Sequence, residues 1–298
     1  INQLKSEITS ISSNTQFNGV NVLDGTISSM VIKTGMNTAQ NVTFSVDTVA
    51  STSLGAFTRT GVTKEAAAAA ATVVAKTNTT AEDLSIHGNT VSKDFAASAA
   101  QSAKTLAAAI NVETGNTGVK AEAKTYAKLL STAAAATYSI TLNGTSTGNF
   151  SIGSTSVGDA VTKINQISGT TGVSASASSD GSFVTLHHSQ GEDISVINDS
   201  AGTDLDVVAV GFDGTTAGST VISLAATAGN DSTSVQGNIQ LTSSKSFSIT
   251  QAGTAALGYF TTGSGSLASI SNVGVKTQAT ATSSIATIDG ALEKISSV

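Results

Sequence analysis

The feature that most constrains this chain is an internal repeat. The segment from Thr105 to Ala123 matches the segment from Asp159 to Ala177 at a constant offset of 54 residues. Upstream, residues 84–88 match residues 140–144 at an offset of 56. Constant offsets over many positions indicate a repeated structural unit. The matching pairs are Ile110 and Ile164, Asn111 and Asn165, Gly115 and Gly169, Gly118 and Gly172, Val119 and Val173, Ala121 and Ala175, and Ala123 and Ala177.

Each repeat predicts a strand, a turn, a second strand, a short amphipathic helix, a glycine turn and a further strand. In the first copy, the alanine-rich segment 96–109 predicts the helix, with Phe95, Leu106 and Ile110 as its core stripe. Because only two copies are visible, we expect two small α+β lobes, at about residues 80–135 and 136–200, rather than a solenoid. Beyond residue 200 the sequence predicts strands at 207–210, 221–224, 239–241 and 247–249.

The two ends of the chain carry matching apolar stripes. Apolar residues recur at heptad a/d spacing, which is typical of helices that pair. Helices this short are marginal in isolation, so the simplest interpretation is that the two stripes face each other. The alternative is that each helix packs separately on a globular core. The residues predicted to make helix–helix contacts are Ile1, Leu4, Ile8, Ile11, Ile285, Ile288, Leu292 and Ile295.

Turn signals follow the first helix. Asn18-Gly19 and Asp24-Gly25 favour tight turns because Asn and Gly tolerate positive φ. Apolar residues around them, Phe17, Val20, Val22 and Leu23, are predicted to anchor the turns to the helices. Residues 30–33 and 42–47 then predict a β-hairpin.

These residues carry a family resemblance. Gln16, Phe17, Asn18 and Gly19, followed by Val22, Leu23, Asp24 and Gly25, resemble the F-N-G-x-x-L-L-D-G signature of bacterial flagellins, with Val22 in place of the usual Leu. Residues 284–292 resemble the start of the family's C-terminal helix. The internal repeat resembles the "IN" motif of flagellins and hook-associated proteins.

The resemblance implies an α+β architecture with two parts. Residues 1–53 and 264–298 would form a helical, coiled-coil-like D1-type domain with a β-hairpin. Residues 54–263 would form an inserted, mainly β outer domain with short helices. Similar segments at 54–58 and 257–261 would be the two crossings between these domains, with glycine supplying the bend.

The resemblance also implies a function. The protein would be a secreted, extracellular structural subunit of the bacterial flagellar filament, with its outer domain exposed as an antigen. Its partners would be other flagellin subunits, through the D1-type domain and through the family's extreme terminal helices, which this chain lacks. Full-length flagellins also bind an innate immune receptor. Of the usual receptor contacts only Glu7 has a counterpart here.

Composition and motifs argue against other classes of function. A net charge of −6 and a pI near 4.9 argue against nucleic-acid binding, which needs a basic patch, and against binding to anionic membranes. No apolar run is long enough for membrane insertion. The chain has no Cys and no H-E-x-x-H motif.

Candidate reactive residues have simpler interpretations. His187 and His188 are adjacent in a predicted strand, so their side chains should point to opposite faces and not to one metal ion. Asp204, Asp206 and Asp213 have incomplete calcium-loop spacing. Residues 144–148 match G-x-S-x-G, but they lie between two predicted strands, whereas a nucleophile elbow needs a strand followed by a helix. We therefore expect neither an enzyme nor a cofactor or metal site.

An alternative function is a cell-surface flagellin homologue that binds polysaccharide or host glycan. Polar, Thr/Asn-rich sheet faces could carry such contacts. Sugar sites usually add aromatic stacking platforms, and this chain has nine Phe, three Tyr and no Trp.

Overall fold

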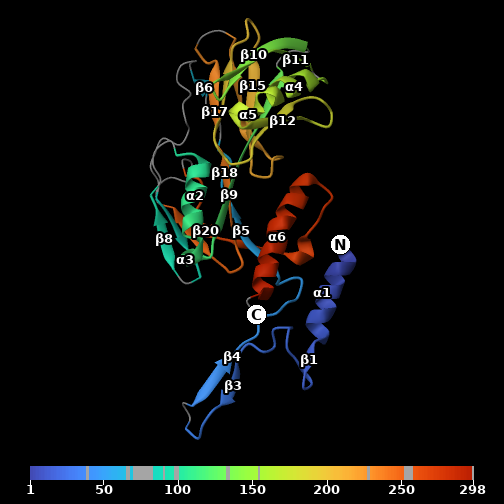
Figure 1. The fold of residues 1–298 in the computed structure, drawn as a ribbon, viewed down its shortest axis with the longest axis vertical. Helices are drawn as coiled ribbons and strands as arrows, with labels where there is room; N and C mark the ends of the chain where they lie inside the picture. The colour runs from blue at the N-terminus through green and yellow to red at the C-terminus, as the bar shows by residue number, and fades with distance from the viewer. Residues whose placement is uncertain are drawn as a thin grey trace. The chain divides into compact units, whose positions relative to one another are not determined.

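The chain combines helices and strands (Figure 1). Of the residues that the structure describes, 23% are helical and 41% lie in strands. The computed structural model describes residues 1–37, 40–64, 68–69, 83–89, 91–96, 101–131, 135–153, 155–226, 229–251 and 258–296. Contacts divide the chain into two units. Unit 1 comprises residues 1–58, 242–247 and 265–298, and unit 2 comprises residues 59–241 and 248–264. Residues 97–100 of the predicted helix at 96–109, together with Leu257 and Val298, lie outside the described residues.

Unit 1 contains both terminal helices and the predicted hairpin. Strands β3 and β4 pair antiparallel in register from Met30–Phe44 to Lys33–Asn41, which confirms the hairpin. Strand β5 pairs with β21, and a Cβ at Gly55 would lie 1.9 Å from the Ala268 carbonyl oxygen, so only glycine fits there. The elements are α1 (Asn2–Asn14), β1 (Gln16–Phe17), β2 (Val20–Asn21), β3 (Met30–Lys33), β4 (Asn41–Phe44), β5 (Gly55–Thr60), β21 (Ser266–Ser269), η1 (Ile270–Asn272) and α6 (Gln278–Ser296).

The C-terminal helix α6 buries a face of small residues. Thr277 caps its start, because its Oγ1 accepts a hydrogen bond from the Thr280 N–H at 3.2 Å. Ser284, Thr287 and Ala291 are buried, and Ala291 packs with Leu54 and Ile270. Close packing on this face therefore depends on small side chains.

The N-terminal helix α1 is held mainly by polar side chains. The Lys5 Nζ donates to the carbonyl oxygens of Ser271 at 2.8 Å and Val273 at 2.6 Å. The hydroxyl of Ser12 donates to the Leu23 carbonyl at 2.8 Å. Of its apolar stripe only Ile8 is partly buried, against the cluster that contains Ala291.

The predicted packing of the two apolar stripes on each other is not present in the chain. Apart from Ile8, all of the stripe residues are 42–68% exposed. The reason is that each helix turns its polar or small face inward, where side chains bond to loop carbonyls, so the apolar face is left outside. The coiled-coil-like helical domain that we expected is therefore not formed by these two helices. The exposed residues are Ile1, Leu4, Ile11, Ile285, Ile288, Leu292 and Ile295.

Unit 2 contains both repeats, and each has the predicted order of elements. The first is β7 (Leu84–His87), β8 (Ser92–Phe95), α2 (Ala103–Val112), α3 (Thr114–Thr117) and β9 (Lys120–Ser131). The second is β10 (Ala135–Leu142), β11 (Thr145–Gly153), α4 (Gly158–Gln166), α5 (Ser168–Thr171) and β12 (Val173–Ala177). Phe95 lies in β8 and not in the helix, since the helix begins only after the Ser102 cap.

The later strands extend the sheets that the repeats begin. Strand β19 pairs antiparallel with β7, and β14 pairs antiparallel with β10, so each repeat hairpin gains a return strand on the same side. The remaining elements are β6 (Ala68–Ala69), β13 (Val184–His188), β14 (Ile194–Asn198), β15 (Leu205–Val210), β16 (Ala217–Leu224), β17 (Ser232–Val235), β18 (Asn238–Ser243), β19 (Ser248–Gln251) and β20 (Gly263–Ser264).

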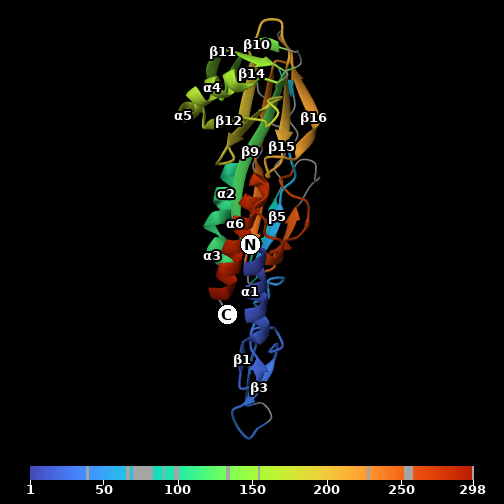
Figure 2. The same ribbon diagram turned by 90° about the vertical axis from the view of Figure 1, so that its right-hand side faces the viewer.

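The two repeats do not form separate lobes. Strand β13, which follows the second repeat, pairs with β9 of the first repeat over Thr125–Leu129. Strand β15 pairs with the other side of β9, and Figure 2 shows these two strands side by side. The buried cluster around Ile140, Ile164 and Leu186 also includes Ala127 and Leu129 of β9. The length of β9 explains the difference from our expectation, because its second half extends beyond its own repeat.

Candidate functional site: the two repeats and their junction

The repeated asparagine is the most specific polar feature of each repeat. In the first repeat, Asn111 Nδ2 donates to the Ala121 carbonyl oxygen and the Ala121 N–H donates to Asn111 Oδ1, both at 2.8 Å. In the second repeat, Asn165 makes the same two bonds with Ala175, at 3.0 and 2.8 Å. A side-chain amide thus takes the place of a neighbouring strand residue in the ladder.

The residue before each asparagine anchors this geometry. Ile110 and Ile164 lie in the last turns of α2 and α4, and both are fully buried. The helix is therefore fixed on the sheet by the isoleucine, and the asparagine of the next position reaches the strand edge. Figures 1 and 2 show α4 and α5 beside β12.

A threonine and a glycine complete the repeated geometry. The Oγ1 atoms of Thr117 and Thr171 each accept a hydrogen bond at 3.2 Å, from the N–H groups of Val119 and Val173. Gly118 and Gly172 have φ of 71° and 72° and end the short helices in the left-handed conformation. Sequence comparison at the 54-residue offset already pairs the two threonines, although it does not reveal their role.

The two asparagine–alanine hydrogen-bond pairs lie in different surroundings. Strand β12 is an edge strand, since β13 is its only strand partner in the described part of the chain. On its outer side, the Val173 N–H donates to the Thr171 hydroxyl, and the N–H and carbonyl of Ala175 bond to the Asn165 amide. These backbone groups are therefore not available to pair with another strand. Strand β9, in contrast, is an interior strand, and Ala121 is buried.

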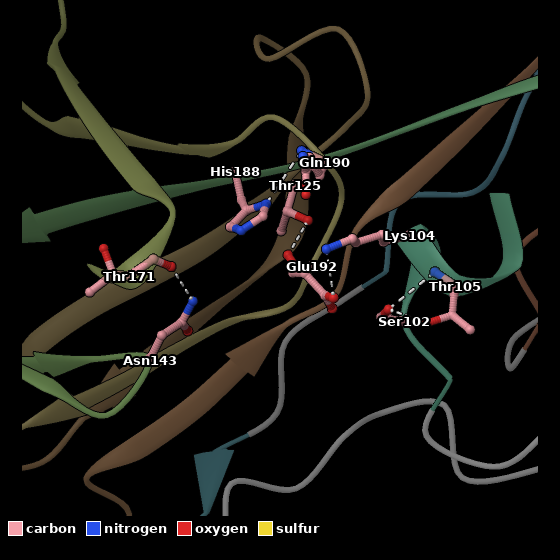
Figure 3. A network of polar contacts seen from close by, with 9 residues as sticks. All are labelled: Ser102, Lys104, Thr105, Thr125, Asn143, Thr171, His188, Gln190 and Glu192. Carbon is pink, nitrogen blue, oxygen red and sulfur yellow. Dashed lines mark hydrogen bonds and ion pairs between the residues drawn. The ribbon is translucent and has the colours of Figure 1, made fainter. Parts of the chain in front are cut away.

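A turn after β13 joins the second repeat to the first (Figure 3). The Thr125 hydroxyl of β9 donates to the Glu192 carbonyl oxygen at 2.6 Å. The Lys104 N–H of α2 donates to the Gly191 carbonyl oxygen at 3.2 Å, and Lys104 Nζ lies 3.3 Å from Glu192 Oε1. We name residues 188–192 the junction turn. Apart from the presence of Gly191, nothing in the amino-acid sequence predicts this turn.

Close packing around the junction turn leaves no room for a side chain at two glycine positions. Gly191 has φ of 74°, and a Cβ there would lie 2.4 Å from the Ala123 Cβ. A Cβ at Gly237 would lie 2.7 Å from both the Gly191 carbonyl oxygen and Thr125 Oγ1. Larger residues at either position would separate the turn from β9.

The two histidines point to opposite faces of β13, as predicted from strand geometry. His187 stacks on Tyr126 with ring centroids 4.4 Å apart, whereas His188 is buried and its Nδ1 accepts from the Gln190 N–H at 3.3 Å. Burial lowers the pKa of both imidazoles, and for His187 the positive charge of Lys124 lowers it further.

The acidic candidates make hydrogen bonds within a turn or between neighbouring segments of a hairpin. The Asp213 carboxylate accepts from Thr215 and Thr216, and these bonds outweigh partial burial and lower the pKa of Asp213 to about 2. Asp204 accepts from the Ala226 N–H, and Asp206 accepts from the Ser223 hydroxyl. Among the residues that the structure describes, no group of three or more His, Asp or Glu side chains could hold a metal ion.

The G-x-S-x-G match is part of a hairpin. Asn143 and Gly144 form the turn, and Ser146 and Gly148 lie in the following strand β11, so the strand–turn–helix order of a nucleophile elbow is missing at this position.

The flagellin-like signature near the N-terminus also forms turns. Asp24 accepts hydrogen bonds from Thr26 and Asn21, and the bonds from Thr26 in particular lower its pKa. Leu23 is partly buried, but Phe17 is 76% exposed. Our expectation that Phe17 and Val20 anchor the turns was therefore wrong, because both side chains of this β1–β2 pair are exposed. The remaining signature residues lie in β1 or in the turns: Gln16, Asn18, Gly19 and Gly25.

Comparison with known proteins agrees with the repeat. The family described as "Flagellin hook IN motif" matches residues 83–134 and 139–186, which contain Asn111 and Asn165 respectively. A search of curated proteins finds no match to the chain. No helix within the described ranges is long and apolar enough to span a membrane. The two motif matches support a flagellin- or hook-like family for this chain and a flagellar-related structural role.

Proposed function

We propose that this chain is part of a subunit of the bacterial flagellar filament, in which unit 1 makes contacts with other subunits and unit 2 is exposed on the outside. The observation that carries the proposal is the inverted polarity of α1 and α6. Both helices bury polar or small residues, and apart from Ile8 they expose their apolar stripes. Helices with exposed a/d stripes are stabilised when partner helices cover them.

The apolar stripe of α6 is suited to packing against a partner helix. Ile285, Ile288, Leu292 and Ile295 recur at spacings of three and four residues, so they lie on one face of α6. The buried face carries Ser284, Thr287 and Ala291, which allow close approach to the rest of unit 1. Partner helices would come from other flagellin subunits and from the terminal helices of the full-length protein.

The β3–β4 hairpin offers a second apolar contact surface. Its large apolar side chains are 39–55% exposed. Because neighbouring residues of a strand point to opposite sides, both faces of the hairpin expose apolar groups. A two-stranded hairpin is marginally stable in water, so assembly would stabilise it. These side chains are Met30, Val31, Ile32, Val42 and Phe44.

The proposed function is mechanical and extracellular, and it needs no catalytic group, cofactor or metal. Burial of apolar surface between subunits would supply the free energy of assembly. Recognition by an innate immune receptor would be a property of the full-length protein.

We rank glycan binding second. Sugar stacking needs open aromatic faces, but among the described residues of unit 2 no Phe or Tyr side chain belongs to the exposed large apolar groups. The Tyr126 ring stacks on His187, and Gly214 lies against it, since a Cβ there would approach the ring to 3.1 Å. Calorimetric titration of this chain with polysaccharide would test this alternative.

The assembly test uses the full-length protein that contains this chain. We expect Ile288→Gln together with Leu292→Gln to abolish growth on short filament seeds, as seen by electron microscopy. The matched control is Val221→Gln, because Val221 is 57% exposed in unit 2. Normal growth of the α6 variant would refute the proposal. Gold-labelled antibody against unit 2 should decorate the filament, and label confined to the cell envelope would favour the glycan-binding alternative.

A further inference from the structure

The sequence contains two Asn-Gly dipeptides, and both form two-residue hairpin turns. Asn18-Gly19 connects the paired residues Phe17 and Val20, and Asn143-Gly144 connects Leu142 and Thr145. The backbone is alike in both turns, with φ of 49° and 77° in the first and 44° and 82° in the second. The two dipeptides therefore differ in what holds the asparagine side chain and not in local backbone conformation.

The Asn143 side chain is fixed at both ends. Its Nδ2 donates to the Thr171 carbonyl oxygen at 3.1 Å (Figure 3), and its Oδ1 accepts from the Ser195 N–H at 2.8 Å. Its own N–H also donates to the Ser195 carbonyl oxygen at 3.1 Å. The side-chain carbon Cγ is therefore held in one orientation.

The Asn18 side chain is exposed and has no hydrogen-bond partner among the residues that the structure describes. The following Gly19 has open space where a Cβ would be, with no atom within 4 Å. Nothing in this part of the structure therefore restrains rotation of the Asn18 amide toward the Gly19 nitrogen.

We propose that Asn18 is a site of spontaneous deamidation and that Asn143 is protected from the same reaction by its hydrogen bonds. The Gly19 backbone nitrogen loses its proton and attacks Cγ of Asn18, which forms an N–Cγ bond. The Cγ–Nδ2 bond breaks, and ammonia leaves with the proton. Water then opens the five-membered succinimide at either carbonyl group, which gives aspartate or isoaspartate.

The modification changes both charge and backbone. Either product places a carboxylate beside Phe17, which is 76% exposed. The isoaspartate product also adds a methylene to the main chain, so a two-residue turn can no longer keep Phe17 opposite Val20. Deamidation would therefore alter an exposed apolar loop of unit 1.

The test follows both sites in one sample. The folded protein is incubated in mildly alkaline buffer and digested with trypsin, which places Asn18 in the peptide 6–33 and Asn143 in the peptide 129–163. Tandem mass spectrometry of these peptides then identifies which asparagine is deamidated. Breaking two hydrogen bonds should slow Asn143 by on the order of tenfold or more relative to Asn18.

A parallel incubation in denaturant provides the matched control. There the two dipeptides lose their structural difference, so their rates should converge. Equal rates in the folded protein, or absence of conversion at Asn18 while the denatured sample reacts, would overturn the proposal. Asn18→Gln should remove the first product and leave the slow reaction at Asn143 unchanged.

Discussion

Asn165 and Ala175 are joined by two hydrogen bonds that replace a missing strand neighbour, with Nδ2 to carbonyl at 3.0 Å and N–H to Oδ1 at 2.8 Å. Asn111 and Ala121 repeat this pairing 54 residues earlier. The same two hydrogen bonds therefore occur once at a buried alanine and once at a partly exposed alanine. Comparing the two sites separates the free-energy cost of burial from the contribution of the hydrogen bonds.

The two asparagines should differ in their contribution to stability. We expect Asn111→Ala to lower the free energy of unfolding by about 2 kcal/mol, because the buried Ala121 backbone groups lose their partner. Asn165→Ala should cost about 1 kcal/mol, since water can reach the partly exposed Ala175. Chemical denaturation of both variants measures the difference, and a larger loss at Asn165 would contradict it.

Opening the β12 edge should cause self-association. The double variant Asn165→Ala with Thr171→Val frees the outward backbone groups of Val173 and Ala175, and an unprotected edge can pair with another molecule. The matched double variant Asn111→Ala with Thr117→Val should stay monomeric, because β9 is an interior strand. Light scattering over a concentration series distinguishes them, and equal association of both would count against a protective role of the edge bonds.

Two adjacent positions in α6 should differ in how strongly a substitution lowers the stability of the chain. Ala291 is 4% exposed, so Ala291→Leu should overpack unit 1 and cost about 1–3 kcal/mol. Its neighbour Leu292 is 57% exposed, and Leu292→Ala should change the stability of this chain by less than about 0.5 kcal/mol. Thermal unfolding provides the measurement. A severe loss with Leu292→Ala would mean that the apolar stripe is buried within the chain.

The junction turn should be sensitive to a single added methyl group. Gly191→Ala adds a Cβ that would lie 2.4 Å from the Ala123 Cβ, at a φ of 74°, and should cost about 3 kcal/mol. Gly202→Ala is the control, because Gly202 has φ of 84° with no atom within 4 Å of an added Cβ. That variant should lose only about 1 kcal/mol from backbone strain. Equal losses would show that the turn can move away from β9.

Stability should fall in mild acid because of the adjacent histidines. The unfolded chain protonates each imidazole near the ordinary pKa of 6.5, whereas burial lowers the pKa of both in the folded protein. The unfolded state therefore binds more protons, and the free energy of unfolding decreases as the pH falls from about 7 toward about 5. His187→Phe keeps a ring against Tyr126 and removes one titrating group, so its pH dependence should be weaker. An unchanged slope would exclude His187 as a source.

The sequence by itself determined the parts of this protein that local spacing controls. The 54-residue offset located both repeats and the order of their elements, since amphipathic period and turn residues act over a few neighbours. Alternation in strands also placed His187 and His188 on opposite faces.

Only the tertiary structure decided which surfaces meet. The apolar stripe of α6 predicted a buried face, yet the small residues Ser284, Thr287 and Ala291 are buried instead, because side-chain size and loop carbonyls at that contact are non-local. Long-range contacts also distinguish Asn18 from Asn143. The two residues lie in turns with similar φ angles, but in the described part of the chain only the Asn143 amide bonds to residues distant in the sequence. Pairing of β13 with β9 joined the repeats for the same reason, since a sheet partner is chosen by contacts across the whole unit and not by the residues next to it in the chain.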